Sequence, residues 1–144
     1  MATLVSRFAA LSRREQVLLC TSALLFLSCR GLLAAVGLDR ARWVSHRLAR
    51  MVPPWTTVEQ PGQITWAVTC AAASLPGSGT CLAQAVVGEA LLAAHGYSST
   101  VRLGVKKSQT EFAAHAWVER ESTVVIGELS DLDQYQPLSE WHGN

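Results

Sequence analysis

A cysteine and a histidine in the second half of this 144-residue chain are residue types that can act together in nucleophilic catalysis. Cys81 stands at the predicted start of an apolar helix, and His115 lies in a predicted strand with an alanine on each side. The free N–H groups of a helix N-terminus stabilise a thiolate, and a neutral imidazole can accept the thiol proton. Gly77–Gly79 would let the backbone approach a bound carbonyl, so the N–H of Cys81 could donate to an oxyanion. The pair indicates a candidate cysteine hydrolase.

A third group usually orients the imidazole in such a site. Glu128 follows the next predicted strand after His115, and an antiparallel hairpin would bring it beside the histidine. Asp131 and Asp133, on the following loop, are competitors. Spacing alone leaves the choice open, because each carboxylate could equally be a solvated surface group.

Each candidate also has an ordinary structural interpretation. Cysteine packs as a small hydrophobe, and a single histidine on a strand is often only a hydrogen-bonded structural residue. Residue type alone therefore leaves both the reactive and the packed role of Cys81 open. The other cysteines and histidines are interpreted as structural: Cys20, Cys29, Cys70, His46, His95 and His142.

Composition predicts a well-packed chain without an obvious polyanionic partner. Hydrophobic residues make up 49 %, charged residues 16 %, and the formal net charge is +1, so nucleic acid binding is not indicated. The four cysteines match no metal-ligand spacing, and no metal or cofactor is expected. Arginines precede the first apolar run and no convincing cleavage site closes it, so a reduced, cytoplasmic setting is predicted.

The N-terminal third is predicted to be helical. Ser12 and Glu15 have the spacing of a capping box, and an apolar helix is expected from Val17 to Val36, with Gly37 as its stop. Arg30 interrupts the apolar run, which favours a buried or partner-covered helix over a membrane span. Membrane contact through residues 17–36, and hence membrane association, stays open.

The rest of the chain changes from helical to strand periodicity. Helices are expected over 39–51, 63–73 and from Thr80 or Cys81 to His95, with Gly96 as a left-handed cap, and strands over 100–105, 112–119 and 123–126. The tail from Leu129 is polar, with one anchor at 135–138. Helices followed by antiparallel strands predict an α+β fold. Prolines near residue 55 suggest an N-terminal helical region, 1–55, and a second domain, 56–144.

Several short segments of the second half carry a family resemblance by their order and spacing. They are Leu75-Pro76-Gly77, Thr80-Cys81-Leu82-Ala83-Gln84-Ala85, Leu91-Leu92, His95-Gly96, Leu103-Gly104-Val105 and Ala114-His115-Ala116-Trp117-Val118-Glu119. Over residues 60–138 the chain resembles the transglutaminase-like cysteine protease of lasso-peptide biosynthesis, the leader peptidase B protein, in its split form. The resemblance implies a papain/transglutaminase-like fold in which a small antiparallel sheet packs on the helix that carries the nucleophile.

The resemblance also implies a catalytic triad. Cys81 and His115 match the family's nucleophile and base. The family's acid is usually an aspartate at the end of the strand after the histidine; the matching residue here is Glu128, one position further along, and Asp131 stays an alternative. The implied reaction removes the leader from a ribosomally made precursor peptide through an acyl-enzyme.

The implied partners are a separate leader-recognition protein, which the split form requires, and an ATP-dependent lasso cyclase that uses the freed amine. We expect the N-terminal helices to provide the docking surface for the recognition protein. Two other functions remain open from the sequence: a transglutaminase-like acyltransferase, which passes the acyl group to an amine, and a non-enzymatic membrane-associated assembly protein in which Cys81 is only packed.

Overall fold

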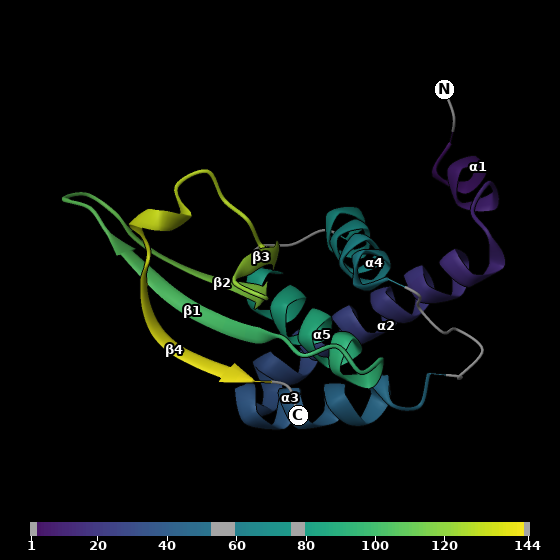
Figure 1. Cartoon of the computed structure of the whole chain (residues 1–144), viewed down its shortest axis with the longest axis horizontal. Helices are drawn as coiled ribbons and strands as arrows, with labels where there is room; N and C mark the ends of the chain where they lie inside the picture. The colour runs from purple at the N-terminus through teal and green to yellow at the C-terminus, as the bar shows by residue number, and fades with distance from the viewer. Residues whose placement is uncertain (1–2, 53–59, 76–79, 143–144) are drawn as a thin grey trace.

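The computed structural model describes residues 3–52, 60–75 and 80–142. Within them the chain forms first helices and then an antiparallel sheet (Figure 1). The helices are α1 (Leu4–Ala9), α2 (Arg13–Val36), α3 (Leu38–Ala49), α4 (Pro61–Ser74) and α5 (Thr80–Ala94). The strands are β1 (Thr100–Lys107), β2 (Phe112–Arg120), β3 (Thr123–Ile126) and β4 (Gln136–His142). This arrangement confirms the predicted α+β class.

Local signals in the sequence fix the ends of the N-terminal helices. The Ser12 hydroxyl accepts from the Glu15 N–H at 3.3 Å, and the Glu15 carboxylate accepts from the Ser12 N–H at 2.8 Å, so the predicted capping box is present. Gly37 adopts a φ of +86° between α2 and α3, a conformation that disfavours side chains with a Cβ. The predicted stop at Gly37 is therefore confirmed.

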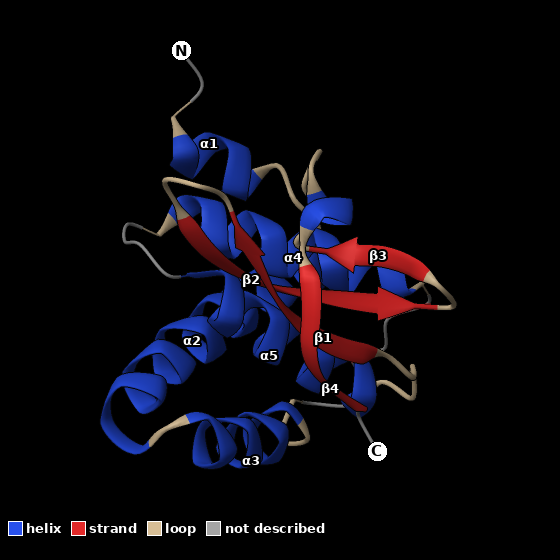
Figure 2. Cartoon of the chain, turned by 90° about the vertical axis from the view of Figure 1, so that its left-hand side faces the viewer, coloured by secondary structure: helices blue, strands red, loops and turns tan. Residues whose placement is uncertain are grey.

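Helix α5 runs through the middle of the molecule. It contacts α2, α3 and α4 as well as strands β1, β2 and β3, and every residue from Ala85 to Leu92 is buried. Figures 1 and 2 show the sheet on one side of α5 and the other helices on the opposite side. Because layers cover both sides, α5 can be apolar all round without exposing hydrophobic surface.

The sheet has the strand order β3-β2-β1-β4, and all its neighbours are antiparallel. Strands β2 and β3 are joined by Glu121 and Ser122, whose φ angles of 51° and 64° are those that a tight two-residue hairpin requires. Ala116 and Val118 of β2 are buried in the core. His115 and Trp117 alternate with them and therefore point to the other face of the strand.

The N-terminal helices share the core with the sheet. Leu25, Phe26 and Cys29 of α2, with Ala41 and Ala49 of α3, belong to the same buried cluster as the centre of α5. The predicted boundary between residues 55 and 56 falls outside the described residues, so it stays a prediction. The shared core shows what positions α5: it is held by helices from the first third of the chain.

Helix α2 also has an open face. It is 24 residues long, and within the described residues it is the single helix long and apolar enough to cross a membrane. Leu25 and Phe26 are buried, whereas Leu24 is 67 % and Leu27 49 % exposed. One side of α2 therefore packs into the protein and the other presents leucines to the surroundings.

Candidate active site

A cleft of about 470 Å³ brings together the residues that the sequence analysis selected. Cys81 and Gln84 line it from α5, His115 from β2, and Glu128 from the segment that follows β3. Thr69 of α4 completes the opposite wall. The residues predicted as nucleophile, base and carboxylate thus line one cleft, although they come from three different elements of the fold and His115 alternates along β2 with the core residues Ala116 and Val118.

Cys81 lies in the first turn of α5, and its side chain is half-buried. Cys81, Gln84 and Gly88 recur at intervals of three and four residues, so they share one face of the helix. A Cβ on Gly88 would lie 2.2 Å from Cδ1 of Ile126 in β3. The missing side chain therefore lets α5 approach β3 closely, and this contact places Cys81 near the end of that strand.

His115 is oriented by the main chain. Its Nε2 lies 2.6 Å from the carbonyl oxygen of Gly127. Because a carbonyl oxygen only accepts, Nε2 must carry the hydrogen, and in the neutral ring Nδ1 is then the unprotonated nitrogen. The ring centroid is also 6.2 Å from that of Trp117 and 5.8 Å from that of Tyr135. The imidazole is held by contacts on several sides, and its proton-accepting nitrogen is defined.

Gly127 can hold this position because it is a glycine. Its φ is +83°, and an added Cβ would lie 2.9 Å from the Ala116 carbonyl oxygen and 3.2 Å from the Trp117 Cα. Both contacts are with main-chain atoms, which cannot swing aside as a side chain can. Sequence reasoning missed this orienting carbonyl, and the available signal was a glycine between the last residue of a strand and the candidate acid.

The thiol and the imidazole are not hydrogen-bonded to each other: the bonds recorded among the described residues give His115 only the Gly127 partner. Such bonds are often long in unliganded enzymes and tighten when substrate binds. The structure therefore shows that Cys81 and His115 line the same cleft and that Nδ1 is the unprotonated nitrogen of the neutral ring. Transfer of a proton from the thiol to this nitrogen requires the two side chains to move closer together.

The three candidate carboxylates have different surroundings. Glu128 is exposed and lines the cleft. Asp131 instead accepts a hydrogen bond from Lys106 at 2.6 Å, which lowers the pKa of the aspartate, and His115 contributes a smaller effect in the same direction. Asp133 is exposed on a short 3-10 helix, Leu132–Gln134. Of the three, Glu128 is the carboxylate that shares the cleft with Cys81.

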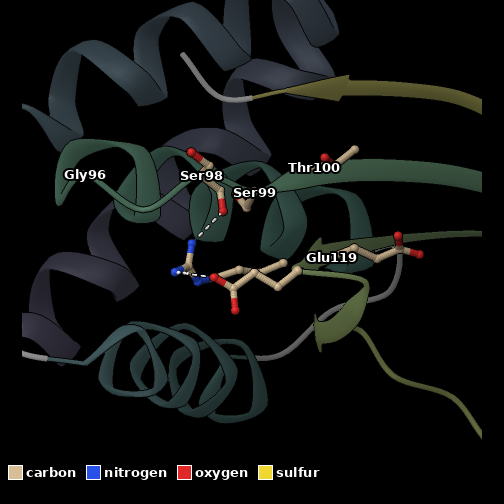
Figure 3. Close-up of a pocket in the computed structure, with 7 residues that line it drawn as sticks. Gly96, Ser98, Ser99, Thr100 and Glu119 are labelled. Carbon is tan, nitrogen blue, oxygen red and sulfur yellow. Dashed lines mark hydrogen bonds and ion pairs between the residues drawn. The ribbon is translucent and has the colours of Figure 1, made fainter.

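A second pocket lies at the opposite end of α5 (Figure 3). Its volume is about 500 Å³, and Ser98, Ser99 and Thr100 line it with hydroxyl groups. Arg120 closes one side by donating to the Ser98 carbonyl oxygen at 2.9 Å. Among the described residues that line this pocket there is no histidine or cysteine, and its two carboxylates are already engaged: Glu119 accepts from Arg102 and Trp117, and Glu121 pairs with Arg120. Within the described residues, no group of three or more His, Cys, Asp and Glu side chains could hold a metal ion.

The chain belongs to the transglutaminase-like superfamily, whose sequence model matches residues 23–140. This membership fits the observed fold, with the cysteine on a helix packed against an antiparallel sheet. It places the chain in a superfamily of papain-like cysteine peptidases and acyltransferases. The match begins inside α2, in agreement with the core that α2 and α3 share with the sheet. No curated protein and no solved structure is found to match this chain.

Proposed function

We propose that this protein is a cysteine peptidase that removes the leader from a ribosomally made lasso precursor peptide. The observation that carries the proposal is the cleft shared by Cys81 and His115, in which the Gly127 carbonyl leaves Nδ1 of the neutral imidazole able to accept a proton. The resemblance of the short segments around these two residues to the leader peptidase family supports the choice of substrate.

The reaction uses an acyl-enzyme. His115 takes the proton of Cys81, and the sulfur attacks the carbonyl carbon of the scissile bond. The main-chain N–H of Cys81 donates to the oxyanion, and the protonated imidazole then gives its proton to the departing amine. Water attacks the thioester with His115 as base, which releases the leader as a carboxylic acid and restores the thiol.

Glu128 is the carboxylate that we assign to the site, because it lines the cleft whereas Asp131 is held by Lys106. Its negative charge stabilises the imidazolium that forms during the reaction. The Gly127 carbonyl already fixes the tautomer, so Glu128 acts mainly through charge. This assignment keeps the acid and the tautomer-fixing group on adjacent residues.

The partners of the proposed enzyme follow from its reaction. A separate recognition protein would hold the leader and dock on the exposed leucine face of α2, defined by Leu24 and Leu27. An ATP-dependent cyclase would use the amine that cleavage exposes. We expect this processing to take place in the cytoplasm, and the same leucine face would be the point of any membrane association.

The deciding experiment replaces the two reactive groups one at a time. The purified chain, the recognition protein and the precursor encoded near its gene are incubated, and the products are weighed by mass spectrometry. Cys81→Ala and His115→Ala should each lose cleavage, whereas Cys20→Ala, an exposed cysteine on α2, should keep it. Full activity of Cys81→Ala would end the peptidase assignment.

A pair of carboxylate variants tests the acid. Glu128→Gln should lower kcat/KM by roughly ten- to a hundredfold, and Asp131→Asn should leave it within about twofold. The reverse ranking of the two variants would transfer the role to Asp131.

Acyl transfer to an amine is the second candidate, because the superfamily includes acyltransferases and the acyl-enzyme is common to both reactions. Adding a primary amine to the assay distinguishes them. A peptidase releases the leader with a new carboxyl group, and a transferase releases it as an amide of the added amine, which differs in mass. Alkylation by iodoacetamide tests the non-enzymatic alternative, since a merely packed Cys81 would react no faster than Cys70, which is also half-buried.

A further inference from the structure

Strand β3 is an edge of the sheet. It pairs with β2 on one side, and on its other side no strand is paired with it among the described residues. The pairing with β2 shifts register near its end, so that Val125 is an extra residue opposite the partner strand. Edge strands carry main-chain N–H and C=O groups that are free to pair with another chain, and here they lie at the end of the sheet that holds the candidate active site.

A groove runs between this edge and helix α4. Beside the cleft that contains Cys81 lies a second hollow, of about 250 Å³, which is lined by Thr65 on α4 and by Thr123 on β3. Val125 lines both this hollow and the cleft that contains Cys81. Thr65 and Thr69 lie one helical turn apart on α4. Thr65 lines the second hollow and Thr69 lines the cleft, so α4 forms one wall of both. The hollows are therefore successive parts of one groove, lined by α4 and β3, which also contact each other.

We propose that this groove, the α4–β3 groove, binds the part of the substrate peptide that follows the scissile bond, as an added antiparallel strand on β3. The inference rests on the proposed peptidase function. All existing strand pairs are antiparallel, and sheets of one kind are favoured over mixed ones. β3 runs toward the cleft, so an antiparallel peptide starts at the cleft and leads away from it. The bound residues are thus those on the leaving-amine side of the cut.

The lining of the groove indicates what it recognises. The walls nearest the cleft are threonines and a valine, which offer no charge to a substrate side chain. At the far end Arg120 already donates to the Ser98 carbonyl oxygen and pairs with Glu121. Affinity would therefore come from main-chain hydrogen bonds, with uncharged side chains preferred. Such recognition tolerates different sequences after the cut.

Reactive peptides test the groove without knowledge of the natural precursor. N-chloroacetyl peptides of alternating alanine and threonine, one to six residues long, place an electrophile at Cys81 and extend on the leaving-amine side. The labelling rate at Cys81, followed by mass spectrometry, should rise about tenfold with length, the gain from roughly two ordinary main-chain hydrogen bonds. N-methylation at alternate residues should remove this gain, and N-methylation at the residues between them should not.

A matched pair of variants on α4 places the effect in the groove. Thr65→Trp fills the second hollow and should abolish the dependence on length, while its reaction with iodoacetamide stays unchanged. Gln63→Trp adds the same side chain at an exposed position of α4 that lines neither hollow and should behave as wild type. Circular dichroism checks that both variants are folded.

The outcomes separate the two claims. Labelling that is independent of length, or a dependence on length that survives Thr65→Trp, would overturn the groove while leaving the peptidase assignment intact. A dependence on length only in peptidyl chloromethyl ketones, which extend on the acyl side, would also overturn it. Inertness of Cys81 toward iodoacetamide, together with absence of precursor cleavage, would overturn the proposed function and this inference with it.

Discussion

Helices α2 and α5 have similarly apolar sequences but different surroundings. In α5, every residue from Ala85 to Leu92 is buried between the sheet and the other helices. In α2, two adjacent leucines differ in solvent exposure: Leu25 is 5 % exposed and Leu24 is 67 % exposed. An apolar sequence therefore indicates that the surface of a helix must be buried. How much of that surface the chain itself buries depends on how many layers of the fold pack around the helix.

The largest expected effect on the free energy of unfolding concerns the polar pair between α3 and α5. Glu89 is fully buried, and its carboxylate lies 2.7 Å from Nε2 of His46 on α3. His46→Ala should lower the free energy of unfolding by about 3–5 kcal/mol, because it leaves a buried carboxylate without its partner. Urea unfolding measures this loss.

The double variant His46→Leu/Glu89→Leu is the control for that pair. It removes both polar groups, so it should be more stable than His46→Ala alone. If His46→Ala costs less than about 0.5 kcal/mol, the pair is not what binds α3 to the nucleophile helix.

A leucine pair compares the two helices directly. Leu91→Ala in α5 should cost about 2–5 kcal/mol, since its side chain is completely buried. Leu24→Ala in α2 should stay within about 0.5 kcal/mol. Equal costs in a monomeric sample would show that the face of α2 is covered within the chain itself.

The exposed face of α2 can be tested for docking without unfolding the protein. Truncating the N-terminal helices would also remove core residues such as Phe26, so it cannot separate docking from folding. Leu24→Lys/Leu27→Lys should leave the melting temperature nearly unchanged and raise the concentration of recognition protein needed for half-maximal cleavage by roughly tenfold or more. An unchanged requirement would place the recognition protein elsewhere.

The smallest expected effect is on the surface ion pair beside the site. The Lys106–Asp131 contact lowers the pKa of the aspartate and raises that of the lysine, in each case mainly through their hydrogen bond. Its stabilisation is fully present above the unfolded aspartate pKa of about 3.9 and below the unfolded lysine pKa of about 10.4. It fades as pH falls through the lower folded value of Asp131 or rises through the higher folded value of Lys106.

Lys106→Met should therefore lower the melting temperature slightly at pH 7. The difference from wild type should shrink below about pH 4, as Asp131 becomes protonated. A difference that persists when the carboxylate is protonated would show that the lysine stem acts through packing rather than charge.

Local patterns predicted most of the fold. The helix over residues 17–36, its capping box, its stop at Gly37, the helix from Thr80 and the strand over 123–126 all rest on signals within a few residues, and all are confirmed. Three elements within the described residues were missed: α1, the 3-10 helix Leu132–Gln134 and β4. β4 contains Pro137 in a polar tail, and it forms only as an edge strand against β1, where proline is tolerated.

Contacts between distant residues were beyond such patterns. The cleft shared by Cys81 and His115 agrees with the prediction that the two approach each other, while their catalytic roles stay a prediction. The His46–Glu89 pair joins residues 43 positions apart, and the Gly127 carbonyl leaves no trace in residue chemistry, because every residue has one. Periodicity reports which residues face inward, but not which partner they meet.

Gly88 affects how α5 packs against β3 beside the cleft, because it has no side chain. It lies two helical turns from Cys81 and does not line the cleft, yet a methyl group there would press on Ile126, at the end of β3. A side chain at this position would force the Cδ1 end of Ile126 to move, between the helix that carries Cys81 and the strand that leads to Gly127. The position of Ile126 in the wall of this cleft thus depends on a residue that does not itself line the cleft.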